Sequence, residues 1–372
     1  MRDFLDWILG QLRRRPKPLW LILTAHVLAL GAALLLYALP HHVIPRTQAA
    51  VGVTSTREMA ARPTAAPTPE PAEDGTGEDS AQTTEDAAQT PEDAAQDSAA
   101  EAAAEDGIPT IIVGDFREKF ADKFTDGEII QTATSYQSPN LNITLSDGYF
   151  NSISSHVYVA DIYVADISCL STVFAKDTYG RGYTEWVGDV ARRTHSIVAL
   201  NGDYYGTRDA GVVIRNGGLF RNNKITRDVA VLYWDGRFEC FNPFDFDAMR
   251  EMENGAYQSW YFGPMLMDGA GNALTGMNCD ASIAKKNPRS ILGYYEPGHY
   301  CFIAVDARNK ESRGADTHEM AALAQYLGCT QAYNLDGGQT SLLAWGDQLV
   351  NKPSDGGRSS SDYIVIADYV SY

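Results

Sequence analysis

The chain has 372 residues, of which 44% are hydrophobic, and a formal net charge of −18. This acidic balance excludes the broad positive surface with which nucleic-acid-binding proteins attract phosphates, so we expect no nucleic-acid partner. A chain of this length usually forms two or three domains, but its first third does not have the composition of a folded domain.

An uncharged apolar segment occupies residues 19–39. A helix of this length, at a rise of about 1.5 Å per residue, spans the roughly 30 Å hydrocarbon core of a bilayer. A cleavable signal peptide is the alternative, although its apolar region would have only about 7–15 residues. Basic residues directly before the segment place residues 1–18 in the cytoplasm by the positive-inside rule. We therefore expect an uncleaved, single-pass anchor in the cell membrane, with the rest of the chain outside the cytoplasm.

Residues 40–108 form a low-complexity acidic segment. Between Glu70 and Asp106 there are thirteen acidic residues and no basic one. Such a segment buries too little apolar surface to offset the entropy of ordering it, so we expect a disordered linker. Mutual repulsion of its charges extends the linker and holds the following domain away from the bilayer.

Residues 109–372 have the composition of one folded domain, and their length suffices for one hydrophobic core. About 22 basic and 32 acidic residues follow Gly107, so this domain is itself acidic. Its cysteines are odd in number and form no CxxC pair, which argues against a zinc site. One disulfide remains an open alternative that the sequence does not assign. The five cysteines are Cys169, Cys240, Cys279, Cys301 and Cys329.

Short strands dominate the expected secondary structure of this domain. Tyr149–Asp166 alternates polar and apolar residues and is rich in aromatic and β-branched side chains, which predicts a strand or hairpin. The turn-forming pairs Asn216-Gly217, Asp235-Gly236 and Pro297-Gly298 predict three further hairpins.

Two single strands and two helices complete the pattern. Apolar runs at residues 195–206 and 361–370 predict strands. Residues 189–193 predict part of a helix, and 316–327 a longer one that begins at the cap residue Asp316 and ends before Gly328. The expected fold class is α+β, with a mixed, largely antiparallel sheet and a few flanking helices.

Polar loops follow several of the predicted strands, which is where a rigid scaffold can present a binding site. A single NGD or DGG motif is usually only a turn. Four such loops in one domain, two of them with an arginine, indicate a site. The loops are Asn201–Asp203, Asn287–Ser290, Asp306–Arg308 and Asn334–Ser341.

The ordered motifs NGDYY, GVVIRNG, NPRS, VDAR, NLDGGQTS and PSDGGR resemble the phosphodiester glycosidase domain family over roughly Tyr149 to Asp368. Family members commonly have glycine where this chain has Ala307 and Gln339, and often Thr where it has Asp316. We expect these differences to change substrate fit more than catalysis. The resemblance implies cleavage between the anomeric carbon of a sugar and a phosphodiester oxygen.

That reaction needs a cation to hold the phosphate and carboxylates to stabilise an oxocarbenium-like centre. The expected catalytic residues are Asp203, Asp306 and Asp336. The expected substrate-binding residues are Asn201, Arg289, Arg308, Asn334, Gly337, Gly338, Thr340 and Ser341.

Within this set, the two arginines are expected to bind phosphate and the two asparagines to orient sugar hydroxyls. Structural alternatives exist for two of the carboxylates. Asp306 would pair with Arg308 or cap a turn, and Asp336 would hold its own loop closed.

The expected function is that of a membrane-anchored, extracytoplasmic glycosidase that hydrolyses sugar-1-phosphodiester linkages in cell-surface or extracellular glycans. One alternative is a non-catalytic carbohydrate-binding or exopolysaccharide-assembly module with aromatic platforms. Another is a glycosyl transferase that uses the same site. No cofactor is expected. The many carboxylates leave a bound divalent cation as an open alternative, although no metal-ligand spacing in the sequence demands one. In the alternative of a carbohydrate-binding module, the aromatic platforms would be Trp186, Tyr204, Tyr205 and Trp260.

Overall fold

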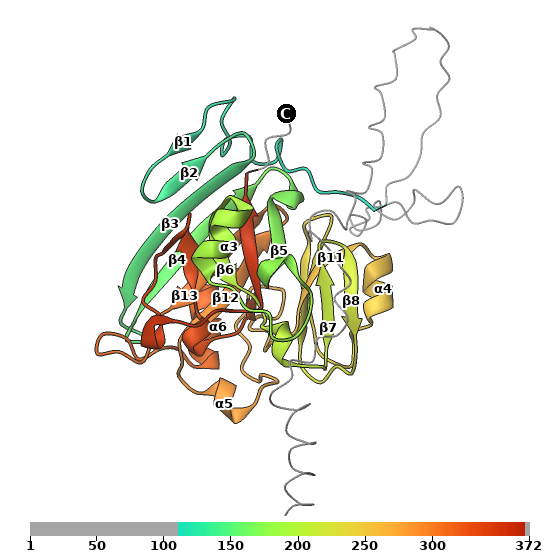
Figure 1. Ribbon diagram of the computed structural model, residues 1–372, viewed down its shortest axis with the longest axis vertical. Coiled ribbons are helices and arrows are strands. Elements are labelled where there is room, and N and C mark those ends of the chain that lie inside the picture. Colours follow the sequence, from blue (N-terminus) through green and yellow to red (C-terminus); the bar gives the residue numbers. More distant parts are fainter. Residues whose placement is uncertain (1–110, 369–372) are drawn as a thin grey trace, which may run out of the picture.

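The computed structural model describes residues 111–368 (Figure 1). The predicted cytoplasmic segment, the anchor and the whole linker lie outside these residues. Among the helices of residues 111–368, none is long and apolar enough to cross a membrane. The described strands pair throughout in antiparallel fashion, which confirms the predicted α+β class with a largely antiparallel sheet.

Two large sheets form the body of the domain, and smaller sheets lie beside them. The seven-stranded sheet has the order β1 (Ile130–Gln131), β2 (Ser135–Gln137), β3 (Leu141–Phe150), β4 (Ser155–Val164), β13 (His299–Val305), β12 (Arg289–Glu296) and β14 (Gln331–Asn334). The five-stranded sheet has the order β16 (Gln348–Leu349), β15 (Leu343–Trp345), β6 (Ser196–Asn201), β17 (Asp362–Ala367) and β5 (Leu170–Phe174).

The smaller elements surround these sheets. A three-stranded sheet has the order β10 (Phe238–Phe241), β9 (Val229–Tyr233) and β11 (Ala256–Trp260), and a hairpin joins β7 (Val212–Arg215) to β8 (Gly218–Asn222). The helices are α3 (Val187–Thr194), α4 (Ala248–Glu253), α5 (Ala281–Ala284) and α6 (Thr317–Tyr326). Short 3₁₀ turns are η2 (Ile167–Cys169), η3 (Ala175–Asp177), η4 (Tyr205–Thr207), η5 (Gly338–Thr340) and η6 (Ser354–Gly356).

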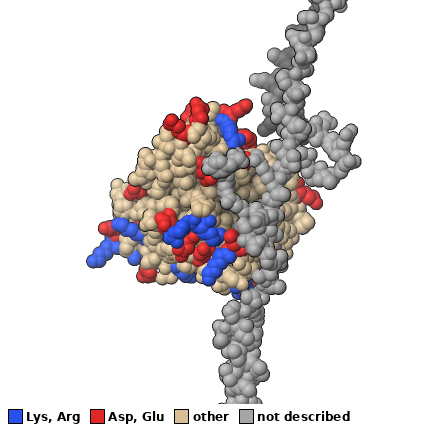
Figure 2. Space-filling model, turned by 45° about the horizontal axis from the view of Figure 1, so that its top comes forward, with Lys and Arg blue, Asp and Glu red and all other residues tan. Residues whose placement is uncertain are grey.

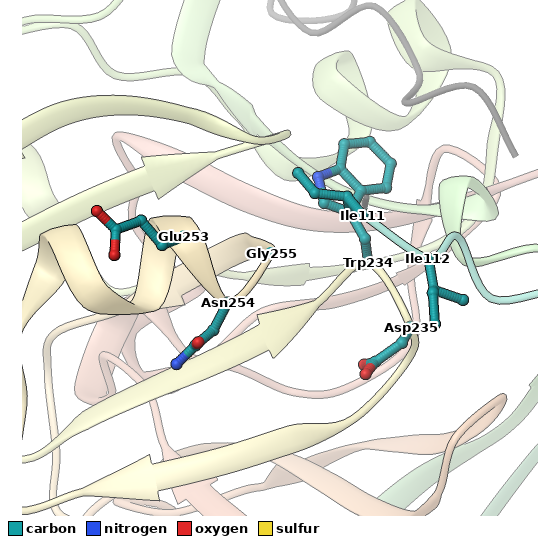
Figure 3. Close-up of a pocket in the computed structure, with 7 residues that line it drawn as sticks. All are labelled: Ile111, Ile112, Trp234, Asp235, Glu253, Asn254 and Gly255. Atoms are coloured by element: carbon teal, nitrogen blue, oxygen red, sulfur yellow. The ribbon is translucent and has the colours of Figure 1, made fainter. Parts of the chain in front are cut away.

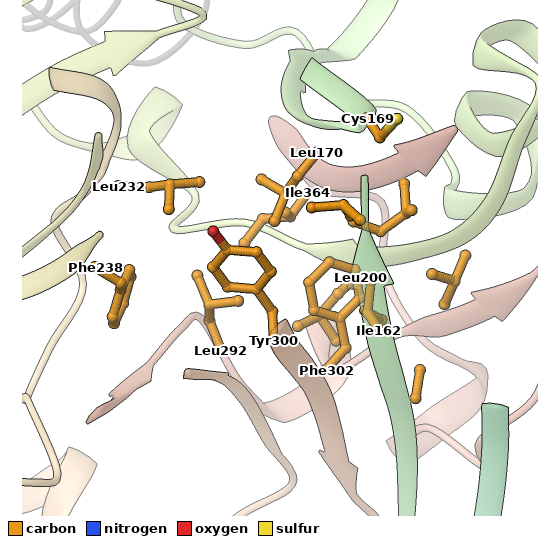
Figure 4. Packing of buried hydrophobic residues seen from close by; sticks show 14 of the residues in the cluster. Ile162, Cys169, Leu170, Leu200, Leu232, Phe238, Leu292, Tyr300, Phe302 and Ile364 are labelled. Carbon is orange, nitrogen blue, oxygen red and sulfur yellow. The ribbon is translucent and has the colours of Figure 1, made fainter. Parts of the chain in front are cut away.

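The main hydrophobic core lies between the two large sheets (Figure 4). Ile162 and Phe302 come from the seven-stranded sheet, and Leu200 and Ile364 face them from the five-stranded sheet. Because side chains alternate along a strand, the neighbouring residues point to the outer faces. One outer face packs on α6 and the other on α3, so the domain is a helix–sheet–sheet–helix sandwich.

Most of the predicted elements are confirmed. Tyr149–Asp166 contributes to the β3–β4 hairpin, and the other three predicted hairpins turn at the expected residues. Helix α6 begins at its predicted cap, where the Asp316 carboxylate accepts a hydrogen bond from the Glu319 amide and the Glu319 side chain accepts one in return. Gly328 follows the helix with a φ of +85°, a left-handed conformation that favours glycine.

The first described residues are fastened to the side of the sandwich. The Gly114 amide donates to the Trp234 carbonyl at 2.7 Å, and the Phe116 amide donates to the Ala165 carbonyl at 2.8 Å. The Phe116 ring lies against Gly236 and Gly298, where a Cβ atom would come within 2.6 Å of it. A small cavity of about 130 Å³ lies between this segment and the end of α4 (Figure 3).

Charged side chains are mostly paired with opposite charges on the surface. Figure 2 shows Lys and Arg side chains next to Asp and Glu side chains on one face. Arg193, for example, lies 2.9 Å from both Asp177 and Glu185. The Arg192–Asp189 pair is more exposed, and exposed pairs contribute little stability each while they keep opposite charges mixed over the surface.

Candidate active site

The polar loops predicted as a site meet at one end of the two large sheets. In the seven-stranded sheet, Arg289 at the start of β12 pairs with Val305 at the end of β13, and Asn334 at the end of β14 pairs with Ile291 of β12. In the five-stranded sheet, Asn201 at the end of β6 pairs with Tyr363 at the start of β17. Antiparallel pairing therefore brings the loops together although they are far apart in sequence.

Asp336 is the central carboxylate of this end. Its Oδ2 accepts hydrogen bonds from Thr340 Oγ1 at 2.5 Å and from Arg358 Nη2 at 3.3 Å, and its Oδ1 accepts one from the Gly337 amide at 2.9 Å. Burial raises the pKa of Asp336, while Thr340, Arg358 and Gly337 oppose that rise by donating to the ionised form. Asp336 is 8% exposed, so only a small part of its side chain is accessible to a reacting group.

Two exposed arginines, Arg308 and Arg358, lie beside the 334–341 loop that carries Asp336. Arg358 also donates to Thr340 Oγ1 at 3.1 Å, and its guanidinium lies 4.6 Å from the ring centre of Tyr204. Arg308 donates to Asn287 Oδ1 at 2.7 Å and lies over Gly338, whose added Cβ would come 3.6 Å from Arg308 Nη1. The Arg358 side chain is 45% exposed, so both the carboxylate and its neighbouring cation can reach solvent.

Asn201 connects the loops of Ser290 and Asp336 from the buried side of the site. Its Nδ2 donates to the Asp336 carbonyl at 2.7 Å, and its Oδ1 accepts from Ser290 Oγ at 2.6 Å and from the Leu342 amide at 3.1 Å. Ser290 Oγ also lies 2.8 Å from Ser341 Oγ. Both Asn201 and Ser341 are fully buried, so the structure places them as supports of the site and not at its surface.

Arg289 is in the site but turns its guanidinium inward. Nε donates to the Ala315 carbonyl at 2.9 Å, and Nη2 donates to the carbonyls of Ile283 and Lys285. The residue is only 2% exposed, and burial lowers its pKa to about 10. These contacts tie the start of β12 to the end of α5 and to Ala315, a role different from the phosphate binding that we expected.

Asp203 lies in a buried ion cluster beneath the site. Arg215 Nη2 is 2.9 Å from Asp203 Oδ1 and 2.9 Å from Asp362 Oδ2, and the three side chains are at most 1% exposed. Asp203 Oδ2 also accepts from the Tyr261 amide at 2.7 Å. Burial, followed by the neighbouring Asp203 carboxylate, raises the pKa of Asp362 to about 7. The Tyr204 amide donates to Asp362 Oδ1 at 3.0 Å, so this cluster positions the loop that carries Tyr204.

Asp306 closes a turn at the rim of the site. Its Oδ1 accepts from the Lys352 amide at 3.0 Å and from Asn351 Nδ2 at 3.2 Å, and burial raises its pKa. Asn351 Nδ2 donates in turn to the Ser341 carbonyl at 2.9 Å. Asp306 therefore braces the chain that leads to Arg358, in agreement with the structural alternative of a closed turn.

Asn334 retains one unused acceptor. Its Nδ2 donates to the Gly263 carbonyl at 2.7 Å, whereas its buried Oδ1 has no hydrogen-bond partner among the described residues.

The structure thus brings every predicted site residue to the same end of the sandwich, but it exposes few of them. Within residues 111–368, no group of three or more His, Cys, Asp or Glu side chains is arranged to hold a metal ion.

Sequence reasoning assigned no role to Arg358, Arg215 or Asp362. All three lie in the quoted motifs or directly after them: PSDGGR ends on Arg358, GVVIRNG contains Arg215, and the last strand begins at Asp362. The motifs therefore already indicated that these three residues lie at or near the site. Their roles depend on contacts with distant residues, such as the Arg215–Asp362 pair, that spacing alone does not reveal.

Comparison with known families matches residues 194–367 to the model described as phosphodiester glycosidase. This part of the chain is similar to the phosphodiester glycosidase family. The matched residues include all the predicted site residues, together with Arg358 and the Arg215 cluster. The resemblance inferred from the ordered motifs is confirmed.

Two individual proteins are similar to parts of this chain. The SPbeta prophage-derived uncharacterized protein YomE of Bacillus subtilis is 28% identical over 184 residues, which is 48% of this chain and 29% of that protein. The chain thus spans less than a third of the length of this curated relative. The zebrafish N-acetylglucosamine-1-phosphodiester alpha-N-acetylglucosaminidase catalytic domain, described as auto-inhibited by its pro-peptide, has a TM-score of 0.50 at 22% identity. That match covers 65% of this chain and 88% of the zebrafish chain, and it establishes a shared fold.

Proposed function

We propose that the domain hydrolyses sugar-1-phosphodiester linkages in cell-surface or extracellular glycans. The observation behind this proposal is the Asp336 carboxylate, which lies beside the half-exposed Arg358 guanidinium on a loop that Arg308 also contacts. A carboxylate next to anion-binding cations suits a substrate with a sugar on one side of the bond and a phosphate on the other. The match of residues 194–367 to the phosphodiester glycosidase model supports a glycosidase-type function.

In this proposal Arg308 and Arg358 hold the phosphate. Their planar guanidinium groups match phosphate oxygens, and both are exposed where Arg289 is buried. Asp336 stabilises the positive charge that develops at the anomeric carbon as the bond to the phosphate oxygen breaks. All its hydrogen-bond partners donate to the carboxylate and so favour the ionised form that this role requires.

The first substrate class to test comes from the fold relative. The zebrafish protein is named for an N-acetylglucosamine-1-phosphodiester. An N-acetylhexosamine joined through its anomeric oxygen to a phosphodiester is therefore our starting substrate. The expected anchor and acidic linker would bring the domain to such groups in an anionic surface polymer.

The test uses the purified full-length chain with a panel of sugar-1-phosphodiesters, including UDP-N-acetylhexosamines, with and without a chelator. We expect release of free reducing sugar and of the phosphate-bearing product. Asp336→Asn should lower kcat by about 10²- to 10⁴-fold because the charge at the reacting centre is lost. Asp122→Asn, at an exposed position beside the start of β3 and so at the opposite end of the seven-stranded sheet from the site, is the matched control and should leave kcat unchanged.

Three outcomes separate the alternatives. Release of free sugar by the wild-type chain, abolished by Asp336→Asn with the melting temperature preserved, supports the hydrolase. Transfer of the sugar to an added acceptor glycan in preference to water would identify a transferase. Binding of the glycan without turnover of any member of the panel would contradict the enzymatic proposal and leave the carbohydrate-binding module.

A further inference from the structure

Two cysteine side chains meet in the interior of the domain. Cys301 lies in the middle of β13, and Cys329 lies just after α6, before β14 begins. Their Sγ atoms are 3.7 Å apart. Both residues are buried, with exposures of 0% and 2%, in the cluster that packs α6 against the seven-stranded sheet.

A glycine makes this approach possible. Gly293 pairs with Cys301 across β12 and β13, and with Ala332 across β12 and β14. A Cβ atom at Gly293 would lie 2.5 Å from Cys301 Sγ and 2.9 Å from Cys329 Sγ. The two sulfurs therefore converge over the bare backbone of Gly293, where any other residue would place a side chain against both of them.

The surroundings favour a reaction between these two thiols. Cys301 donates a hydrogen bond that holds the pKa of Cys329 below its ordinary value, and the thiolate is the form that attacks a disulfide. Cys240 is in β10 and Cys279 precedes α5, in other parts of the domain. Burial raises the pKa of both of these thiols.

We propose that Cys301 and Cys329 form a disulfide bond as the domain folds. The thiol of Cys301 first forms a mixed disulfide with a disulfide oxidant, either a small-molecule disulfide or a protein dithiol oxidase. The Cys329 thiolate then attacks the Cys301 sulfur and displaces the oxidant's thiolate. The protein loses two protons and two electrons, and the oxidant's disulfide is reduced to two thiols. Closing the gap from 3.7 Å to a bond of about 2.05 Å requires a shift of less than 2 Å.

The bond would fasten a part of the chain that leads into the active site. Cys329 precedes β14, and β14 ends at Asn334, two residues before Asp336. A disulfide to β13 would close a loop of 28 residues that contains α6 and would restrict the unfolded chain. It would thereby hold the start of β14 on the central strands while its far end presents the site.

The test needs no assumption about the compartment. The purified full-length chain is reduced and unfolded, refolded with reduced and oxidised glutathione, quenched, alkylated under denaturing conditions and digested without reduction. Mass spectrometry should find one cross-linked peptide pair, which joins Cys301 to Cys329, and no cross-link that involves Cys169, Cys240 or Cys279. The refolded protein should melt roughly 5–10 °C higher than the same protein refolded in excess reductant.

The control variants distinguish this pair from the other thiols. Cys329→Ala should abolish both the cross-link and the effect of reductant on melting temperature, whereas Cys240→Ala should preserve both. Alkylation of both Cys301 and Cys329 in correctly refolded protein would overturn the proposal, and so would a cross-link from either one to another cysteine. Because the mapping is made on the unsubstituted chain, a variant that does not fold leaves the result intact.

Discussion

Arg289 and Arg358 both lie beside the 334–341 loop, but their guanidinium groups meet different partners. Arg289 donates to three backbone carbonyls and is 2% exposed, whereas Arg358 contacts a carboxylate and a hydroxyl with a side chain that is 45% exposed. Backbone carbonyls hold a guanidinium in place without neutralising it. The first arrangement fixes a loop, and the second leaves a cation available for an anionic ligand.

The two arginines should therefore respond differently to truncation. Arg358→Ala should lower kcat/KM by about 10- to 100-fold, as expected for the loss of one charge-assisted hydrogen bond to the phosphate, with the melting temperature nearly unchanged. Arg289→Ala should lower the free energy of unfolding by about 2–3 kcal/mol because three backbone carbonyls lose a charged, buried donor. Steady-state kinetics and denaturant unfolding of both variants check the assignment, which would be reversed if Arg289→Ala changed only KM.

Asp362 should make stability depend on pH. Its pKa is raised to about 7 in the folded domain by burial and by Asp203, against about 3.9 in an unfolded chain. Between about pH 4 and pH 7 the folded state keeps a proton that the unfolded state has lost, so this group's contribution to stability is present below about pH 4 and declines as pH rises through 7.

The variant Asp362→Asn removes this titration. We expect the stability of the wild type relative to the variant to decrease from pH 4 to pH 7 and then to level off. Denaturant unfolding at several pH values measures the difference, and the shape of its pH dependence is informative even if the variant is less stable throughout. A difference that is constant with pH would show that Asp362 does not titrate in this range.

At the scale of elements, the loop after β14 depends on two glycines with different constraints. A Cβ at Gly337 would lie 2.6 Å from the Pro288 carbonyl oxygen, a rigid backbone atom. Gly338 has a φ of +68°, but the nearest atom to its added Cβ is Arg308 Nη1 at 3.6 Å. One position is limited by space and the other by backbone conformation.

We expect Gly337→Ala to reduce kcat/KM by about 10²-fold, because moving the loop by an ångström displaces Asp336 from its substrate. Gly338→Ala should cost about 1 kcal/mol of stability for its left-handed conformation and reduce kcat/KM much less. Kinetics and thermal unfolding of the pair test this. Equal losses of activity in the two variants would contradict the steric argument.

The features of the fold that the sequence predicts correctly depend on residues close together in the chain. Asn216-Gly217, Asp235-Gly236 and Pro297-Gly298 set their hairpins through turn chemistry that the sequence displays directly. The pairing of β4 with β13 joins segments about 140 residues apart, as Val157 opposite Val305 shows, and no pattern along the chain specifies it. The stacking of two sheets into one sandwich follows from such distant pairings and was not predicted.

The site shows the same division. The motif loops identified Asp336, Thr340 and Gly337 because these residues act within one loop. The direction of the Arg289 side chain depends on carbonyls at the end of α5, and the burial of Asp203 depends on Arg215. The type and order of residues in the motifs were enough to locate the site. Which of its side chains are exposed could be learned only from the tertiary structure.

At the scale of the whole molecule, the expected anchor and linker remain a proposal about residues 1–108. Full-length protein should stay with membranes after a high-salt wash, whereas a chain without residues 1–45 should be released with kcat unchanged, because the site lies entirely within residues 201–362. Protease added to intact cells should digest the domain in the full-length protein. Release of the full-length chain by salt, or protection of the domain in intact cells, would contradict this arrangement.

The attachment of the first described residues has a mechanical consequence. If the preceding chain is held at a surface while a polymer bound at the site moves, tension enters the domain near Gly114 and Phe116. There it is opposed by backbone hydrogen bonds to Trp234 and Ala165 and by the Phe116 ring between two glycine turns. The force passes into β4 and the turn after β9, so the junction at Phe116 would yield before the loop of Asp336 is deformed. Pulling experiments that grip the N-terminal end should therefore show an early extension of a few residues while the domain still turns over its substrate.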